Sequence, residues 1–76
     1  MKALLEEFVR AIVDEPASVR VTEETEDGVV FLDLEVAEGD RGKVIGKRGR
    51  TADALRTLLD AVARRRGVEC DTEVVD

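Results

Sequence analysis

The sequence predicts a small α+β domain with the element order α-β-β-α-α-β, in which three helices cover one face of a three-stranded sheet. Apolar residues recur every three or four positions in residues 2–14 and 50–66, as they do on the buried face of a helix. Apolar and polar residues alternate in residues 18–24, 29–37 and 68–75, which is typical of strands with one buried face. A short helix before the long one completes the order.

Length and composition limit the kinds of protein this can be. A chain of 76 residues is expected to form one domain, residues 1–76, because a chain this short cannot bury a second core. The absence of histidine excludes a Ser-His-Asp triad and His-ligated zinc, and a single cysteine excludes an internal disulfide. No segment resembles a signal peptide or a membrane span. We therefore expect a cytoplasmic protein with no cofactor, no metal and no membrane partner.

Residues 2–14 are expected to form a helix that covers the core and carries no chemistry of its own. Pro16 ends it, because proline disfavours helical dihedral angles in the preceding residue, Glu15. The predicted apolar stripe consists of Leu4, Leu5, Phe8, Val9, Ile12 and Val13.

Residues 18–24 and 29–37 are expected to form a hairpin. The turn between them contains Asp27-Gly28, a pair that readily adopts the positive φ angles of a two-residue hairpin turn. The outer face of the second strand carries Val29 and Phe31, which leaves two interpretations open. Either the turn half-shields Phe31, which we favour, or Phe31 faces a partner. The buried face of this strand consists of Val30, Leu32, Leu34 and Val36.

In the second half of the chain, Asp40 is expected to be the N-cap of a short helix, residues 41–45, whose Val44 and Ile45 point inward. The longer helix ends at Gly67. Cys70 falls on the inward face of the last strand, which favours a small core residue over a nucleophile. The inner stripe of the longer helix consists of Ala52, Leu55, Leu58, Leu59, Val62 and Ala63.

The net charge of −6 is unevenly distributed along the chain. Residues 1–39 carry a net charge of −8, residues 40–66 carry +6 and residues 67–76 carry −4. A polyanion responds to the local field more than to the total charge, so the basic stretch is a candidate nucleic-acid surface. The alternative is that these cations only solvate the outer faces of helices. The large change in net charge between neighbouring segments favours a nucleic-acid surface.

The glycine-rich segment in this basic stretch excludes two nucleotide-binding motifs. A P-loop needs four residues between its glycines and a hydroxyl residue after its lysine. Here three residues separate Gly42 from Gly46, and Arg48 follows Lys47. The chain also contains no Gly-x-Gly-x-x-Gly fingerprint of dinucleotide-binding folds.

Residues 46–49 instead form a Gly-x-x-Gly sequence between two predicted helices. The two glycines allow another backbone to approach closely, and the helix that follows presents its N–H groups toward that approach. Lys47 and Arg48 fill the variable positions, and Lys43 and Arg50 extend the positive charge. A sugar-phosphate chain suits such a surface. The alternative is that the glycines serve only the geometry of a turn between helices.

The sequence GKVIGKRGRT at residues 42–51 resembles the signature of KH domains, whose GXXG loop clamps about four nucleotides of single-stranded nucleic acid. The element order resembles the type II form of this domain. Across the whole chain the sequence resembles the KhpA family, small bacterial RNA-binding proteins with one KH domain. The resemblance implies that residues 46–49 form the clamp, that Ile45 lines the floor of a groove, and that Arg50 and Thr51 begin the long helix.

The resemblance also implies partners: single-stranded RNA, on which such a protein could act as an RNA chaperone, and either a second copy of the chain or a longer protein of the KhpB/Jag type. With two phenylalanines and no Asn or Gln, the site has few groups for reading bases, so we expect broad specificity. The expected RNA-binding residues are Lys43, Ile45, Gly46, Lys47, Arg48, Gly49, Arg50 and Thr51.

We therefore expect a non-enzymatic RNA-binding module. One alternative is a protein-interaction module that uses the same scaffold chiefly to dimerise. An enzyme of phosphoryl chemistry is disfavoured, because the sequence has no P-loop, metal cluster or evident base. Residues 64–66, three arginines, lie about 24 Å along the helix from the loop at 1.5 Å per residue. They could extend an RNA track or only complement the helix dipole.

Overall fold

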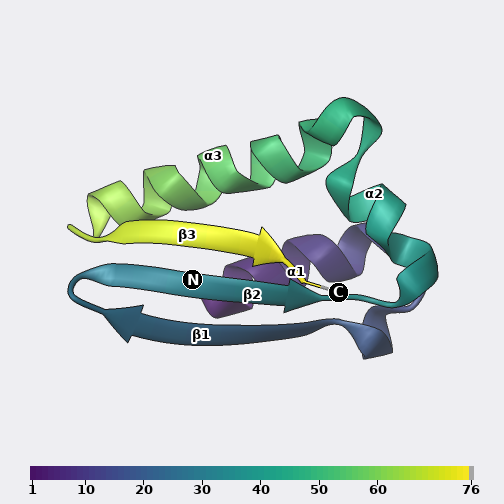
Figure 1. Ribbon diagram of the computed structural model, residues 1–76, viewed down its shortest axis with the longest axis horizontal. Helices are drawn as coiled ribbons and strands as arrows, with labels where there is room; N and C mark the ends of the chain where they lie inside the picture. Colours follow the sequence, from purple (N-terminus) through teal and green to yellow (C-terminus); the bar gives the residue numbers. More distant parts are fainter. Residues whose placement is uncertain (76) are drawn as a thin grey trace.

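The computed structural model describes residues 1–75 and confirms the predicted order of helices and strands (Figure 1). Single turns of 3-10 helix lie at Pro16–Ser18, Glu38–Asp40 and Lys47–Gly49. The helices are α1 (Lys2–Ile12), α2 (Arg41–Ile45) and α3 (Arg50–Arg65), and the strands are β1 (Arg20–Glu26), β2 (Val29–Glu35) and β3 (Glu69–Val74).

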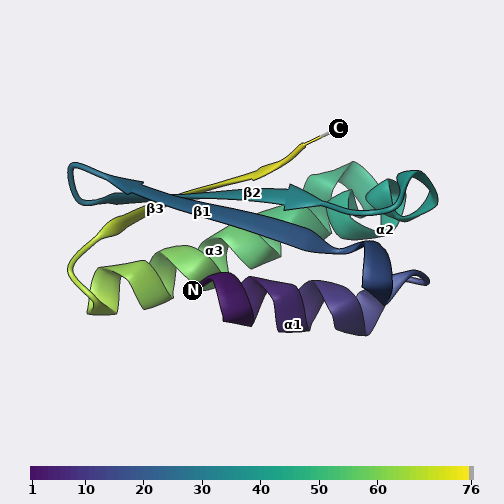
Figure 2. The same ribbon diagram turned by 90° about the horizontal axis from the view of Figure 1, so that it is seen from below.

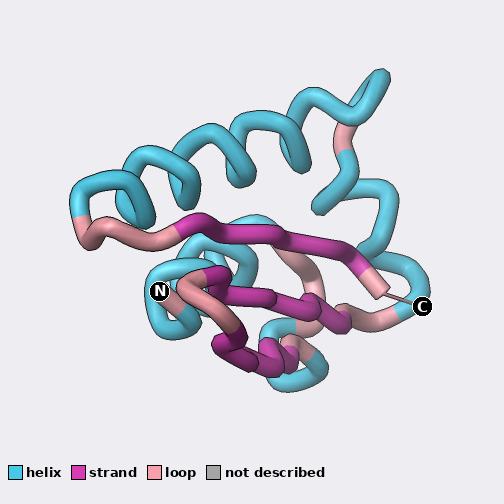
Figure 3. The backbone as a smooth tube through the Cα atoms, turned by 60° about the vertical axis from the view of Figure 1, so that its left-hand side comes forward, coloured by secondary structure: helices cyan, strands magenta, loops and turns pink. Residues whose placement is uncertain are grey.

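The three strands form one sheet in the order β1-β2-β3, with β1 antiparallel and β3 parallel to the central β2. The hairpin turn has positive φ angles at Asp27 (50°) and Gly28 (78°), as the Asp-Gly pair predicts. Helices α1 and α3 lie on the same side of the sheet, and α2 lies at one end of it (Figure 2). Figure 3 shows α3 alongside β3, the strand at the edge of the sheet.

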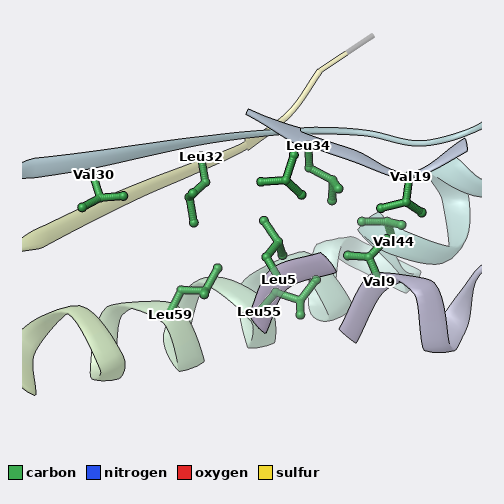
Figure 4. Packing of buried hydrophobic residues seen from close by; sticks show 10 residues of the cluster. Leu5, Val9, Val19, Val30, Leu32, Leu34, Val44, Leu55 and Leu59 are labelled. Atoms are coloured by element: carbon green, nitrogen blue, oxygen red, sulfur yellow. The ribbon is translucent and has the colours of Figure 1, made fainter. Parts of the chain in front are cut away.

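The hydrophobic core lies between the sheet and the helices. Val30, Leu32 and Leu34 point from β2 toward the helices, where Leu5 and Leu59 meet them (Figure 4). This confirms the predicted buried face of β2, because a strand with period-two alternation turns every second side chain inward. The core cluster consists of Leu5, Val9, Val19, Val21, Val30, Leu32, Leu34, Val44, Leu55 and Leu59.

The predicted apolar stripes of the helices are wider than the faces that the structure buries. Phe8 and Ile12 on α1 and Leu58 on α3 are 44%, 41% and 37% exposed. A sheet of three strands covers only the centre of each stripe. Phe31 is 37% exposed and therefore partly shielded, and its neighbours in the sheet register are Glu24 and Asp71.

Several predicted boundaries and orientations need correction. Helix α1 ends at Ile12 rather than at residue 14, because Val13 is extended (φ −94°, ψ 159°). Strand β1 begins at Arg20, since Pro16–Ser18 forms a 3-10 turn. Cys70 does face the core cluster but is only partly buried, with its Sγ 3.6 Å from the Thr72 hydroxyl.

Candidate nucleic-acid interface

Gly46 is the position in the loop between α2 and α3 where only glycine fits. Its backbone has φ 76° and ψ 171°, a conformation that L-residues rarely adopt. A Cβ placed on Gly46 would overlap the Thr51 side chain and lie 2.8 Å from the Thr51 backbone nitrogen. Thr51, which is partly buried, therefore packs against the loop backbone at the start of α3.

The rest of the loop is a tight turn that directs its two cations outward. The Gly49 N–H donates to the Gly46 carbonyl at 3.1 Å, and both Arg48 (φ 59°) and Gly49 (φ 74°) are left-handed. A Cβ on Gly49 would meet open space, so this glycine is required only by its backbone angle. The side chains of Lys47 and Arg48 are consequently exposed.

The four predicted cations of the loop region differ in their surroundings. The Lys43 ammonium is paired with the Asp14 carboxylate at 2.6 Å. This hydrogen bond raises the pKa of Lys43 above its ordinary value of 10.5, against a smaller opposing effect of desolvation. Within residues 1–75, Lys47, Arg48 and Arg50 form no ion pair. These three exposed cations are therefore available to an anionic ligand.

Asp40 occupies the predicted N-cap position of α2, but its side chain makes no capping hydrogen bond to that helix. It is 2% exposed, and its two carboxylate oxygens accept the backbone N–H groups of Asp14 and Glu15, each at 3.0 Å. Asp40 thus joins the chain after α1 to the start of α2, and the Asp14–Lys43 ion pair reinforces the same junction. The junction holds the short helix that leads into the loop. The sequence gives no local signal for it, because the partners are 25 to 29 residues apart.

A groove of about 470 Å³ extends from the loop between α3 and β3. Ile45 lines this groove and is 43% exposed, so the expectation that Ile45 points into the core is wrong. Across the groove, the Arg56 Nε donates to the Thr72 carbonyl at 3.2 Å. The lining consists of Ile45, Gly49, Ala52, Asp53, Arg56, Glu73 and Val74.

Asp53, Arg56 and Glu73 line the groove although no sequence pattern indicates them as site residues. Asp53 and Arg56 are one turn apart on α3, a spacing typical of a solvated ion pair, and their contact is 3.4 Å long. The alternation of residues in the last strand places Glu73 on the face opposite Cys70, Thr72 and Val74. Nothing in the local pattern could have placed them together, because only the packing of α3 beside β3 forms the groove.

Other candidate features lie away from this region or are absent. Arg64 and Arg65 lie in the last turn of α3 and Arg66 follows it, at the end of the helix near the β1–β2 turn rather than near the loop (Figure 1). A second open cleft of about 590 Å³, which includes Asp60, Arg64 and Cys70, lies at that end. In the described part of the chain no group of three or more Cys, Asp and Glu side chains could hold a metal ion. None of the described helices is long and apolar enough to cross a membrane.

Comparison with known proteins shows to which family this chain is related. The sequence model of the family described as "KhpA/KhpB, KH domain" matches residues 2–74. Proteins named RNA-binding protein KhpA are similar over almost their whole length. The one from Chlamydia trachomatis is 42% identical over 100% of this chain and 97% of its own. The one from Clostridium acetobutylicum is 43% identical over 99% and 100%, and the one from Treponema pallidum is 47% identical over 96% and 91%.

The comparison with solved structures found no match for this chain. The family is one of KH domains and not of enzymes. The sequence match over residues 2–74 and the α+β fold agree with each other. This chain therefore belongs to the KhpA/KhpB family of KH domains.

Proposed function

We propose that this protein binds single-stranded RNA along a path that begins at the loop of residues 46–49 and continues into the groove between α3 and β3. The phosphates contact Lys47, Arg48 and Arg50, and the bases enter the groove beside Ile45. The names of the relatives, RNA-binding protein KhpA, support RNA as the ligand.

The observation that carries the proposal is the position of three unpaired cations where the loop meets the N-terminus of a 16-residue helix. Free backbone N–H groups at such a terminus attract anions. The adjoining groove is partly apolar through Ile45, Ala52 and Val74, as a surface for the faces of bases must be. Positive charge at the loop and an apolar floor beside it match the two sides of a single strand.

The test is the double variant Lys47→Asp/Arg48→Asp, measured by fluorescence anisotropy with a labelled single-stranded RNA at several salt concentrations. Three neutralised phosphates give a slope of log affinity against log salt of about −2, from about −0.7 per phosphate on a single strand. The variant is expected to lose most of this slope together with its affinity. Aspartate tolerates the left-handed backbone at position 48 better than most residues, so the fold should persist.

The matched control is Arg65→Asp/Arg66→Asp, which makes the same change of charge at the far end of α3. It should bind RNA with a slope close to that of the parent protein. The proposal is wrong if the loop variant melts like the parent and still binds with the parental affinity and slope. In that outcome the loop is a structural turn, and the protein-interaction interpretation takes its place.

A second function, self-association, is favoured by the exposed apolar side chains on α1. We propose that Phe8 and Ile12, one turn apart on that helix, pack against a second copy of the chain. Phe31 is less suitable, because it lies between Glu24 and Asp71, and a symmetric contact there would bring carboxylates of two copies together. The same helix face could serve pairing with a longer KH-containing protein of the KhpB/Jag type, a pairing that the joint family description supports.

Sedimentation velocity of the parent protein and two variants tests this second function. Phe8→Asp should shift a dimer toward the monomer, whereas Phe31→Asp should leave it intact. A parent protein that is monomeric at high micromolar concentration would refute self-association. Loss of the dimer in Phe31→Asp alone would place the contact on the open face of the sheet instead.

A further inference from the structure

The groove between α3 and β3 carries charged side chains, each of which acts only as a hydrogen-bond donor or only as an acceptor. Asp53 and Glu73 are carboxylates, which only accept hydrogen bonds, and Arg56 is a guanidinium, which only donates them. Asp53 and Arg56 come from α3 and Glu73 from β3, so the groups lie on both walls. This inference rests on the proposed binding of RNA in the same groove.

Arg56 is held across the groove by its contacts. Its Nε donates to the Thr72 carbonyl at 3.2 Å, and its Nη1 lies 3.4 Å from the Asp53 carboxylate. The guanidinium makes no other hydrogen bond within residues 1–75, so its remaining N–H groups are available to a ligand. The Asp53 and Arg56 side chains are 75% and 46% exposed, and each can therefore reach an incoming base.

We propose that Asp53, Arg56 and Glu73 select bases that carry an amino group over uracil. The Watson–Crick edge of cytosine presents an amino N–H beside two acceptors, N3 and O2. A carboxylate can accept from the amino group while Arg56 donates to the acceptors. Adenine likewise has its amino group beside the acceptor N1, and guanine offers two adjacent N–H donors to one carboxylate.

Uracil fits the same groups poorly. Its single Watson–Crick donor, N3–H, lies between two carbonyl oxygens, which would face a carboxylate as like partial charges. Cytosine also has two acceptors, but its amino donor lies at the end of the edge, so one carboxylate can accept from it while Arg56 donates to the acceptors beside it. In uracil the donor lies between the two acceptors, so a carboxylate that reaches it also meets a carbonyl oxygen on each side. With these groups in the groove, the protein should discriminate between bases more than the broad RNA specificity expected from the sequence.

The test compares the affinities of oligocytidylate and oligouridylate octamers by fluorescence anisotropy, because the two bases have the same size and differ mainly at this edge. The parent protein should bind oligocytidylate about tenfold more tightly, within the range of discrimination that one good base-edge contact provides. In Asp53→Asn/Glu73→Gln the ratio should fall toward one. An amide both accepts and donates, and it can therefore pair with the uracil carbonyls.

The matched control is Glu24→Gln/Glu26→Gln on β1, at the other edge of the sheet. It removes the same two negative charges outside the groove, so it should change both affinities alike and keep their ratio. Equal binding of the two oligonucleotides by the parent protein, or a ratio that survives in the groove variant, would overturn the inference and leave RNA binding in place. If neither oligonucleotide bound, both the proposed function and this inference would be overturned.

Discussion

Replacing each loop glycine by alanine should destabilise the protein to very different extents. At Gly46 an alanine must adopt φ 76° and ψ 171°, which costs roughly 1–3 kcal/mol. Its Cβ would also lie 2.8 Å from the Thr51 backbone nitrogen, and overpacking of this kind adds about 1–3 kcal/mol. We therefore expect Gly46→Ala to lower the free energy of unfolding by about 4 kcal/mol.

At Gly49 the backbone is left-handed (φ 74°) but the space beside it is open. Gly49→Ala should therefore cost only about 1–2 kcal/mol, the penalty of that conformation for an L-residue. In a domain of this size a change of 1 kcal/mol in the free energy of unfolding shifts Tm by about 4–8 °C. The Tm values of the two variants should therefore differ by at least about 10 °C. The total stability expected for 76 residues is about 4–11 kcal/mol, which leaves Gly46→Ala marginally folded at best.

Thermal and urea denaturation followed by circular dichroism measure both effects. Adding Thr51→Ala to Gly46→Ala should recover little stability, because the Thr51 backbone nitrogen, which remains, is itself too close. Equal losses in Gly46→Ala and Gly49→Ala would refute the reasoning, since they would mean that the close approach to Thr51 has no energetic consequence. Full recovery by Thr51→Ala would show that the side chain alone is the obstacle.

Three further predictions concern the surroundings of the loop. Asp40→Ala should lower the free energy of unfolding by about 3 kcal/mol in urea denaturation, because two backbone N–H groups lose a charged acceptor. The pKa of Lys43 is raised in the folded protein, so its ion pair with Asp14 contributes stability below about pH 10.5 that is lost as the pH rises through the folded pKa. Asp14→Asn should therefore flatten the alkaline decline of Tm, and an unchanged decline would contradict this assignment. Cys70→Ala should leave RNA affinity unchanged, because Cys70 lines the cleft at the far end of α3; a weakened complex in the anisotropy assay would place RNA there.

Two features of the candidate site were predictable from short stretches of sequence. The Gly-x-x-Gly sequence predicts a turn with two cations between its glycines. The apolar periodicity of residues 50–66 predicts a helix immediately after that turn. Such signals depend on a few neighbouring residues, so they can be recognised without knowledge of how the rest of the chain packs. The orientation of Ile45 did not follow in this way. Its position next to Val44 fits a helix face equally well toward the core or toward the groove, and only the packing of α2 against its neighbours decides between them.

The sequence by itself determined the order of elements, the hairpin turn at Asp27-Gly28 and the basic loop, because each depends on local backbone preference or on residue spacing. Only the tertiary structure decided which cations remain free. Asp14 and Lys43 are 29 residues apart, and their ion pair distinguishes Lys43 from Lys47, Arg48 and Arg50, which form no ion pair within residues 1–75. The tertiary structure also placed the Asp40 carboxylate on the chain after α1 and carried Arg56 across to the Thr72 carbonyl. These contacts join segments that meet only when the helices pack on the sheet, and no pattern within either segment specifies its partner.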